Sequence, residues 1–277
     1  MDHSYLNRFS LEDKIIVITG AAGLLGEQHA CAVAEAGGTP ILLDIRGDSV
    51  TELANTLSDK YEISVLAYTV DITDEEAISR NTRILLERFE RIDVLINNAA
   101  NNPNMKIPNS ANLSRLESFP LEAWNADLAV GLTGAFLCAK HYGSAISQNQ
   151  HGGIIVNIAS DLGLIAPDQR LYRQPGLADD QQSVKPVSYS VVKTGLIGLT
   201  RYLATYWPDQ VRCNALCPGG VEDDQSKDFI DQVKQMIPLG RLAQRDEYKS
   251  AIQFLCSEAS SYMNGACIVI DGGRTCW

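Results

Sequence analysis

The sequence predicts a single α/β domain built on a parallel β-sheet with helices on both faces. Short, continuous apolar runs alternate along the whole chain with longer segments of helical periodicity, which is typical of strand–helix–strand units. The length of 277 residues suits one such domain. Because no internal repeat or Pro/Gly/Ser-rich linker divides the chain, we expect one domain over residues 1–277.

Seven apolar runs are expected to form the strands of one sheet. Strands that are buried on both faces of a parallel sheet are continuously apolar rather than alternating in polarity. The predicted strands are residues 15–19, 41–44, 65–70, 94–97, 154–158, 211–216 and 267–270.

Five segments with helical periodicity lie between these strands. Gly37 and Gly38 follow the first, and glycine commonly ends a helix in left-handed backbone. Thr73 and Glu76 have the spacing of a capping box at the start of the second. The predicted helices are residues 25–36, 74–89, 121–146, 189–206 and 246–258.

Composition and charge argue against several classes of partner. The net charge of −11 disfavours nucleic acid, which is bound largely through phosphate neutralisation. The seven cysteines are scattered, and the close pair Cys213 and Cys217 has no second pair nearby, so we expect reduced thiols and no metal site. No apolar stretch approaches the roughly 18 residues of a membrane span, and residues 1–10 contain no signal-peptide core. We therefore expect a cytoplasmic protein without membrane contact.

Two connections, residues 101–119 and 161–187, are long for a compact domain. Loops beyond about 12–15 residues are usually functional or mobile, and both follow the carboxyl ends of strands, where open α/β sheets bind ligands. We interpret residues 161–187 as a substrate loop. Its Arg170 and Arg173 are candidates for pairing with a carboxylate or phosphate on the substrate. The same segment contains four acidic residues, so solvated arginines at the surface stay the alternative.

A glycine-rich turn with Gly20, Gly23 and Gly26 follows the first strand and opens a helix. These glycines allow the backbone to approach a pyrophosphate, and the helix N-terminus offers free N–H groups. Asp44 ends the second strand, where a carboxylate can bind the adenosine ribose and repel a 2′-phosphate. Arg46 could instead accept that phosphate. The sequence thus predicts a Rossmann-type site that prefers NAD, with NADP as the alternative.

Tyr189 and Lys193 lie four residues apart at the start of a predicted helix and therefore share one face. A tyrosine has a pKa of about 10 and is a poor base at neutral pH. A neighbouring ammonium group and the positive nicotinamide ring would favour the phenolate and lower that pKa. The pair predicts acid–base chemistry beside a nicotinamide.

Together these motifs resemble the short-chain dehydrogenase/reductase family over nearly the whole chain. The resemblance implies a single-domain Rossmann fold, NAD(P)-dependent interconversion of an alcohol and a carbonyl in a small-molecule substrate, and a homotetramer or homodimer. The matching stretches are residues 19–26, 70–71, 97–100, 155–160, 189–193, 214–219 and 270–273.

The resemblance also implies roles by position. Tyr189 corresponds to the catalytic acid/base, Lys193 to the lysine that binds the nicotinamide ribose, and Ser160 to the serine that hydrogen-bonds the reacting oxygen. The implied cofactor-binding residues are Gly20, Gly23, Leu24, Leu25, Gly26, Asp44, Arg46, Asp71, Ile72, Asn98, Ala99, Tyr189, Lys193, Pro218 and Gly219.

The chain departs from the family pattern at two positions of the site. Leu24 replaces a glycine of the short branch, and Gly131 replaces the asparagine that holds a proton-relay water. The glycine spacing, the stretch 131–134 and the insert 165–169 resemble a bacterial subgroup associated with flagellin modification and legionaminic acid. This likeness implies a sugar-like, polyhydroxylated substrate.

Two alternatives to a simple dehydrogenase stay open. An epimerase or dehydratase of a sugar or nucleotide sugar would retain its NAD and give no net NADH. A non-catalytic dinucleotide-binding protein would bind NAD without turnover; Gly131 and Leu24 favour it, whereas Ser160, Tyr189 and Lys193 argue against it.

Overall fold

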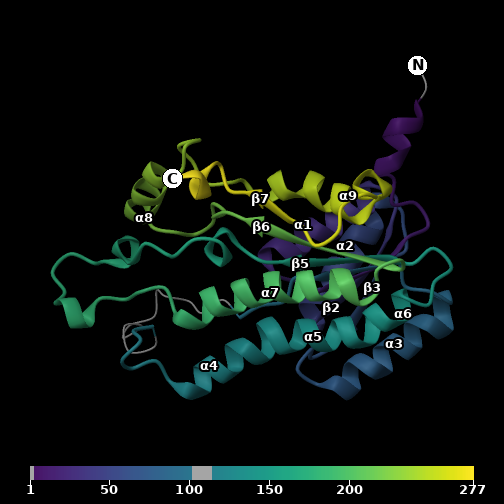
Figure 1. The fold of residues 1–277 in the computed structure, drawn as a ribbon, viewed down its shortest axis with the longest axis horizontal. Coiled ribbons are helices and arrows are strands. Elements are labelled where there is room, and N and C mark those ends of the chain that lie inside the picture. Colours follow the sequence, from purple (N-terminus) through teal and green to yellow (C-terminus); the bar gives the residue numbers. More distant parts are fainter. Residues whose placement is uncertain (1–2, 102–113) are drawn as a thin grey trace.

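The computed structural model describes residues 3–101 and 114–277, in which one parallel sheet lies between two layers of helices (Figure 1). The strand order is β3-β2-β1-β4-β5-β6-β7, and all neighbouring strands run parallel. This arrangement confirms the predicted Rossmann-like fold and its seven strands. The strands are β1 (Ile15–Thr19), β2 (Thr39–Asp44), β3 (Leu66–Thr69), β4 (Val94–Asn97), β5 (Gly153–Ile158), β6 (Val211–Pro218) and β7 (Cys267–Ile270).

The continuous apolar character of the strands follows from burial on both faces of the sheet. In β1, Ile16 and Ile18 belong to the core on one face, whereas Ile15 and Val17 belong to the core on the other. Successive side chains of a strand point to opposite faces, so a central strand of this sheet needs an apolar residue at every position.

One face of the sheet is covered by α1 (Leu24–Glu35), α2 (Gly47–Tyr61) and α9 (Lys249–Cys256). Helix α2 is absent from the helices predicted above. Its fully buried positions are Val50, Ala54 and Leu57, which form one narrow apolar stripe on an otherwise polar helix.

The opposite face is covered by α3 (Glu75–Phe89), a long helical segment over residues 121–146, and α7 (Val187–Tyr206). Tyr142 and Leu203 are among the side chains that these helices bury against the sheet.

The helical segment over residues 121–146 is continuous, as predicted, but it contains two wider turns. It consists of α4 (Leu121–Leu128), α5 (Gly134–Cys138) and α6 (Ser144–Ile146), joined by π-helical turns at Ala129–Thr133 and Ala139–Gly143. Such π-turns are frequent near functional sites. The first of them contains Gly131.

The structure confirms the predicted end of one helix and corrects the predicted start of another. Gly37, the second residue after α1, has φ +87°, the left-handed conformation predicted for it. The capping box from Thr73 is wrong, because Asp74 caps α3 and its carboxylate accepts from the backbone N–H groups of Glu76 and Ala77.

The connection over residues 161–187 contains three 3-10 turns and extends from the sheet toward the left of Figure 1. Its Leu171 packs against Val233 of α8 (Lys227–Val233) and against Ile237 and Leu242. Residues 102–113 of the other long connection lie outside the described residues.

The order of the strands reverses between β1 and β4, since β2 and β3 lie on one side of this pair and β5 to β7 on the other. In open α/β sheets ligands bind at such a switch point, outside the carboxyl ends of the strands. Within the described part of the chain, no helix is long and apolar enough to cross a membrane. Nor do His, Cys, Asp and Glu side chains cluster as a metal site there.

Candidate active site

The glycine-rich turn is packed so tightly that side chains would not fit. Gly20 has φ +61°, and a Cβ on it would lie 2.7 Å from Cα of Ala99. A Cβ on Gly26 would lie 2.2 Å from the carbonyl oxygen of Gly20. Gly23 precedes α1 without a side-chain cap, and Leu24 and Leu25 form the first turn. The turn therefore fits a pyrophosphate group, which would bind the free N–H groups of α1.

Thr19 and Asn98 hold this turn against the end of β4. The hydroxyl of Thr19 accepts from the backbone N–H groups of Asn98 at 3.0 Å and Ala99 at 3.1 Å. The amide Nδ2 of Asn98 donates to the carbonyl oxygens of Thr19 and Gly20, both at 3.0 Å. Asn98 and Ala99 thus support the turn, and so does Thr19, which is not among the cofactor-binding residues predicted above.

Asp44 supports the same turn, a contact that the sequence does not reveal. Its carboxylate accepts from the backbone N–H of Ala22 at 3.0 Å, from that of Arg46 at 3.0 Å and from Arg46 Nε at 3.2 Å. Asp44 is 6% exposed, whereas the side chain of Arg46 is 55% exposed. One carboxylate therefore connects the turn, the end of β2 and the exposed arginine.

The remaining predicted cofactor residues lie at or just after the carboxyl ends of other strands. Asp71 is exposed and accepts from the N–H and the hydroxyl of Thr73. The side chain of Ile72 is buried under Gly134. Pro218 ends β6, and the N–H of Gly219 donates to Ile270 of β7 at 2.9 Å.

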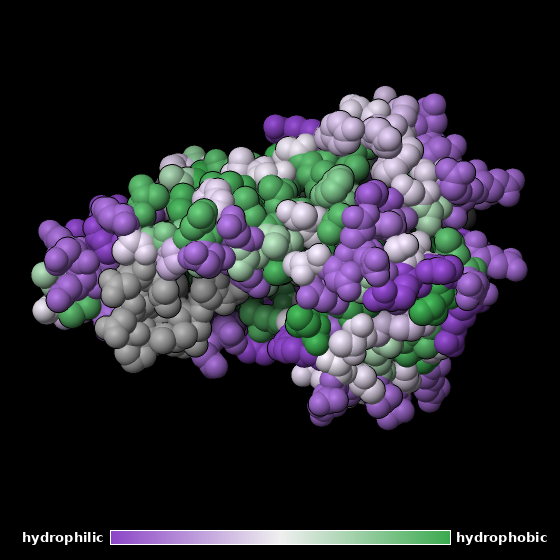
Figure 2. All heavy atoms as spheres, turned by 90° about the horizontal axis from the view of Figure 1, so that it is seen from below, coloured by the Kyte–Doolittle hydropathy of each residue, from purple (hydrophilic) through white to green (hydrophobic). Residues whose placement is uncertain are grey.

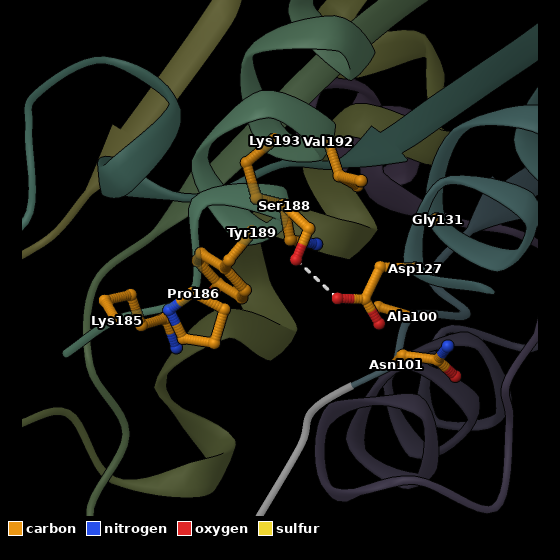
Figure 3. Close-up of a pocket in the computed structure, with 10 residues that line it drawn as sticks. All are labelled: Ala100, Asn101, Asp127, Gly131, Lys185, Pro186, Ser188, Tyr189, Val192 and Lys193. Carbon is orange, nitrogen blue, oxygen red and sulfur yellow. Dashed lines mark hydrogen bonds between the residues drawn. The ribbon is translucent and has the colours of Figure 1, made fainter. Parts of the chain in front are cut away.

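Ser160, Tyr189 and Lys193 come together although 29 residues separate the serine from the tyrosine. The hydroxyl of Tyr189 donates to Oγ of Ser160 at 3.4 Å. Lys193 Nζ donates to the carbonyl oxygen of Ile158 at 2.8 Å and lies 5.8 Å from the centre of the Tyr189 ring. Figure 3 shows Tyr189 and Lys193 on one face of α7.

Burial has a large effect on the ionisation of Tyr189 and Lys193. Burial raises the pKa of Tyr189, and the hydrogen bond with Ser160 offsets this only in part. Burial also lowers the pKa of Lys193 to about 8. Desolvation of the phenolate is thus the largest effect on the pKa of Tyr189, and the lowering expected from the ammonium group together with a positive nicotinamide stays a prediction.

A buried ion pair orients the hydroxyl of Ser160. The hydroxyl of Ser160 donates to Oδ1 of Asp161 at 2.8 Å, and Arg274 donates to Oδ2 of the same carboxylate at 3.1 Å. Asp161 is 2% and Arg274 8% exposed. Since the hydrogen of Ser160 is directed at Asp161, the lone pairs of its oxygen are left to accept from Tyr189.

A cavity beside Tyr189 encloses about 400 Å³, including space open to solvent. Asp127 of α4 faces Tyr189 across the cavity and accepts a hydrogen bond from the hydroxyl of Ser188 (Figure 3). The lining residues are Ala100, Asn101, Asp127, Gly131, Lys185, Pro186, Ser188, Tyr189, Val192 and Lys193.

Comparison with known proteins identifies the family of this fold and site. Residues 14–172 match the family model described as short chain dehydrogenase, and residues 178–275 match the one described as Enoyl-(Acyl carrier protein) reductase. The chain belongs to the short-chain dehydrogenase family. It is accordingly an NAD(P)-dependent oxidoreductase that interconverts an alcohol and a carbonyl.

The similarity extends over almost the whole length of individual relatives. The NADP-dependent mannitol dehydrogenase of Hypocrea jecorina is 34% identical over 98% of this chain and 95% of its own. The NAD-dependent glycerol dehydrogenase of Listeria innocua is 31% identical over 96% of each chain. A solved short-chain type dehydrogenase/reductase from Mycobacterium marinum superposes with a TM-score of 0.83 at 28% identity, covering 99% of both chains.

In this dehydrogenase, the absence of a side chain at Gly131 is required by the packing of α7. A Cβ on Gly131 would lie 2.5 Å from Cγ1 of Val192, the residue before Lys193. We expect Gly131→Asn to lower the free energy of unfolding by about 1–3 kcal/mol, the usual cost of overpacking, and to lower kcat by displacing α7. Chemical denaturation and steady-state kinetics measure both effects. Adding Val192→Ala should restore part of the stability, and a gain in kcat for Gly131→Asn alone would contradict this explanation.

The structure does not bring Arg170 and Arg173 of the dehydrogenase to the cavity. Arg170 pairs with Asp168 at 2.6 Å, and its side chain is 84% exposed. Arg173 pairs with Asp179 at 3.3 Å, and its side chain is 62% exposed. Acidic residues of the same connection thus neutralise both arginines at the surface, whereas Lys185, near its end, lines the cavity.

Proposed function

We propose that the protein catalyses the reversible NAD(P)-dependent oxidation of a hydroxyl group on a polyol or another sugar-like molecule. The observation that carries the proposal is that Tyr189 and Lys193 line one cavity and that the hydroxyl of Tyr189 donates to Ser160 at its edge. The names of the mannitol and glycerol dehydrogenases support a polyol as the substrate class.

In the proposed mechanism, Tyr189 exchanges a proton with the oxygen of the substrate. The nicotinamide of a dinucleotide bound at the glycine-rich turn would supply the hydride acceptor for oxidation or the hydride donor for reduction. The raised pKa of Tyr189 keeps the phenol protonated at neutral pH, as an acid for carbonyl reduction requires. Lys193, fixed by the carbonyl of Ile158, supplies positive charge that stabilises the phenolate formed by proton transfer.

Ser160 is proposed to orient the reacting oxygen beside Tyr189. The Asp161–Arg274 ion pair fixes Asp161, which in turn fixes the hydroxyl of Ser160. For Ser160 to donate to a substrate oxygen, its hydroxyl has to rotate away from Asp161. The connection over residues 161–187 begins beside Ser160 and ends beside Tyr189, so we propose that it forms the substrate loop.

The experiment that tests this function is a panel of alditols, aldonates and free sugars incubated with NAD and with NADP. Appearance of NAD(P)H with at least one compound is the expected result. Binding of the dinucleotide without turnover of any compound would favour the non-catalytic alternative. Chemical conversion without net NAD(P)H would favour an epimerase or dehydratase.

For the cofactor, we propose a preference for NAD, because Asp44 places a buried carboxylate at the end of β2. We expect NAD to bind more tightly than NADP in isothermal titration calorimetry. Asp44→Asn keeps an acceptor for the N–H of Ala22 and removes the negative charge. It should therefore reduce the difference in affinity between NAD and NADP. Arg46→Ala is the matched control and should leave NAD binding within a few-fold. If the wild type bound NADP more tightly than NAD, and Arg46→Ala lost this preference, the proposal would be contradicted.

We also propose that the chain forms a homodimer or homotetramer through α5 and α7. Exposed apolar or aromatic side chains follow the outer side of these helices: Phe136, Val191, Tyr202 and Tyr206. Figure 2 views the molecule from the side that is lowest in Figure 1 and shows hydrophobic residues in a band across its upper part. Apolar surface of this kind commonly marks a contact with another chain. Sedimentation equilibrium of the full chain measures the oligomeric state.

The narrower likeness to proteins of flagellin modification gains no support from the relatives described above, and the proposed function does not include it. A location in the cytoplasm stays a prediction.

A further inference from the structure

Lys185 is a charged residue of the cavity that the proposed mechanism leaves without a role. Its Nζ lies 3.7 Å from the centre of the Tyr189 ring. The backbone N–H of Lys185 donates to Oε1 of Gln169 at 2.8 Å, and Pro186 follows it, so its main chain is held on both sides. Figure 3 shows Lys185 and Pro186 on the same side of the cavity as Tyr189.

The charge of Lys185 is not neutralised by a carboxylate of the described residues. Within residues 3–101 and 114–277, no Asp or Glu oxygen forms an ion pair with it at 4.0 Å or less. Residues 102–113 contain no Asp or Glu. Asp127 in the same cavity accepts from Ser188, and Asp161 pairs with Arg274.

Partial burial makes this unpaired charge costly for the protein. Desolvation lowers the pKa of Lys185 to about 8, and Asp161 counteracts this only in part. Lys185 is therefore still mainly protonated at neutral pH. A buried or partly buried ammonium group usually has an anionic partner. A partner that arrives with the substrate would satisfy Lys185 only in the complex.

We propose that Lys185 is a specificity-determining residue that binds an anionic group of the substrate, so that the enzyme prefers anionic polyhydroxy compounds to neutral polyols. The inference rests on the proposed function and names the substrate class of the same site. The position of Nζ over the ring of Tyr189 places the anionic group only a few bonds from the reacting carbon. A carboxylate and a phosphate share this chemistry, and the test separates them.

The test compares kcat/KM for three compounds of equal chain length: an alditol, the matching aldonate and the matching alditol phosphate. We expect one of the two anionic compounds to be preferred by the wild type, and its identity shows which group Lys185 binds. Lys185→Met should lower the ratio of anionic to neutral kcat/KM by about 10- to 100-fold, chiefly through KM, as expected for the loss of a hydrogen bond to a charged group. Lys185→Arg should retain most of the preference.

The matched control is Lys60→Met, since Lys60 is exposed and its Nζ lies over the ring of Tyr61, 4.8 Å from its centre, on the opposite face of the sheet. Lys60→Met removes the same charge and the same kind of ring contact. The ratio of kcat/KM for the anionic compound to that for the neutral compound should not change. A wild-type preference for the alditol, or an equal loss for all three compounds in Lys185→Met, would overturn the role of Lys185 and leave the proposed function standing.

Absence of turnover with every compound would count against the proposed function instead. In that case, calorimetry of aldonate and alditol phosphate binding to the complex with NAD(P) tests whether Lys185 binds an anionic group. Tighter binding to the wild type than to Lys185→Met would support it, and equal binding would refute it.

Discussion

Tyr189→Phe is expected to lower kcat by about 10²- to 10⁴-fold, the range typical of removing a general acid–base group. Phenylalanine fills the same space beneath Lys185 and loses only the hydroxyl that donates to Ser160 at 3.4 Å. NAD(P) affinity should therefore stay within a few-fold, because the phenol is needed for proton transfer rather than for holding the dinucleotide. Steady-state kinetics on the substrate found in the panel, with calorimetric dinucleotide binding, measures both quantities.

The control for this substitution is Tyr262→Phe, which removes a phenol from a fully exposed tyrosine and should leave kcat unchanged. Lys193→Ala should weaken dinucleotide binding as well as turnover, because Lys193 is proposed to act on both the ribose and Tyr189. More than a tenth of wild-type kcat in purified Tyr189→Phe would show that another group transfers the proton.

Acid is expected to destabilise the fold through His29, a fully buried histidine of α1 whose two ring nitrogens have no hydrogen-bond partner in the described structure. Burial lowers its pKa from 6.5 to about 3. Between these values the unfolded chain binds a proton that the folded chain does not. The stabilisation is therefore complete above pH 6.5 and is lost progressively as the pH falls toward 3. From pH 7 to pH 5 the loss from this one group is about 2 kcal/mol.

Urea unfolding at several pH values between 5 and 7 measures this loss. His29→Phe replaces the ring by one of similar size that does not titrate, so it should flatten the dependence by about 2 kcal/mol over this range. His151→Gln removes an exposed histidine and should leave the dependence as it is. Identical pH dependence in the wild type and His29→Phe would show that His29 is protonated at little cost in the folded protein.

The strands were predictable from sequence because burial on both sides requires continuous apolar runs. Helix α2 was not, because it buries only Val50, Ala54 and Leu57 against the sheet and is polar elsewhere. The cap of α3 was misplaced by one residue, since Thr73 and Asp74 both have side chains suited to capping and only the backbone geometry decides between them.

For the site, residues within short motifs could be predicted, and contacts between distant residues could not. Tyr189 and Lys193 share a helical face by their spacing alone, and the order of the motifs indicated Ser160. By contrast, Arg274 lies 113 positions from Asp161, and nothing in its local sequence indicates a buried partner. The spacing of Arg170 and Arg173 suggested an anion site, but the nearby Asp168 and Asp179 pair with both.

The buried Asp161–Arg274 pair affects when the site can fold while the chain is synthesised on the ribosome. Asp161 lies 113 positions before Arg274, so Ser160 and Asp161, which follow β5, are synthesised long before the cation that supports them. Until β7 has joined the sheet, the carboxylate of Asp161 would be buried without its counter-charge, which proteins avoid. The pocket around Ser160 is therefore expected to become rigid only after β7 and Arg274 have been synthesised, and a nascent chain that ends before β7 would hold a hydrated, loosely ordered site.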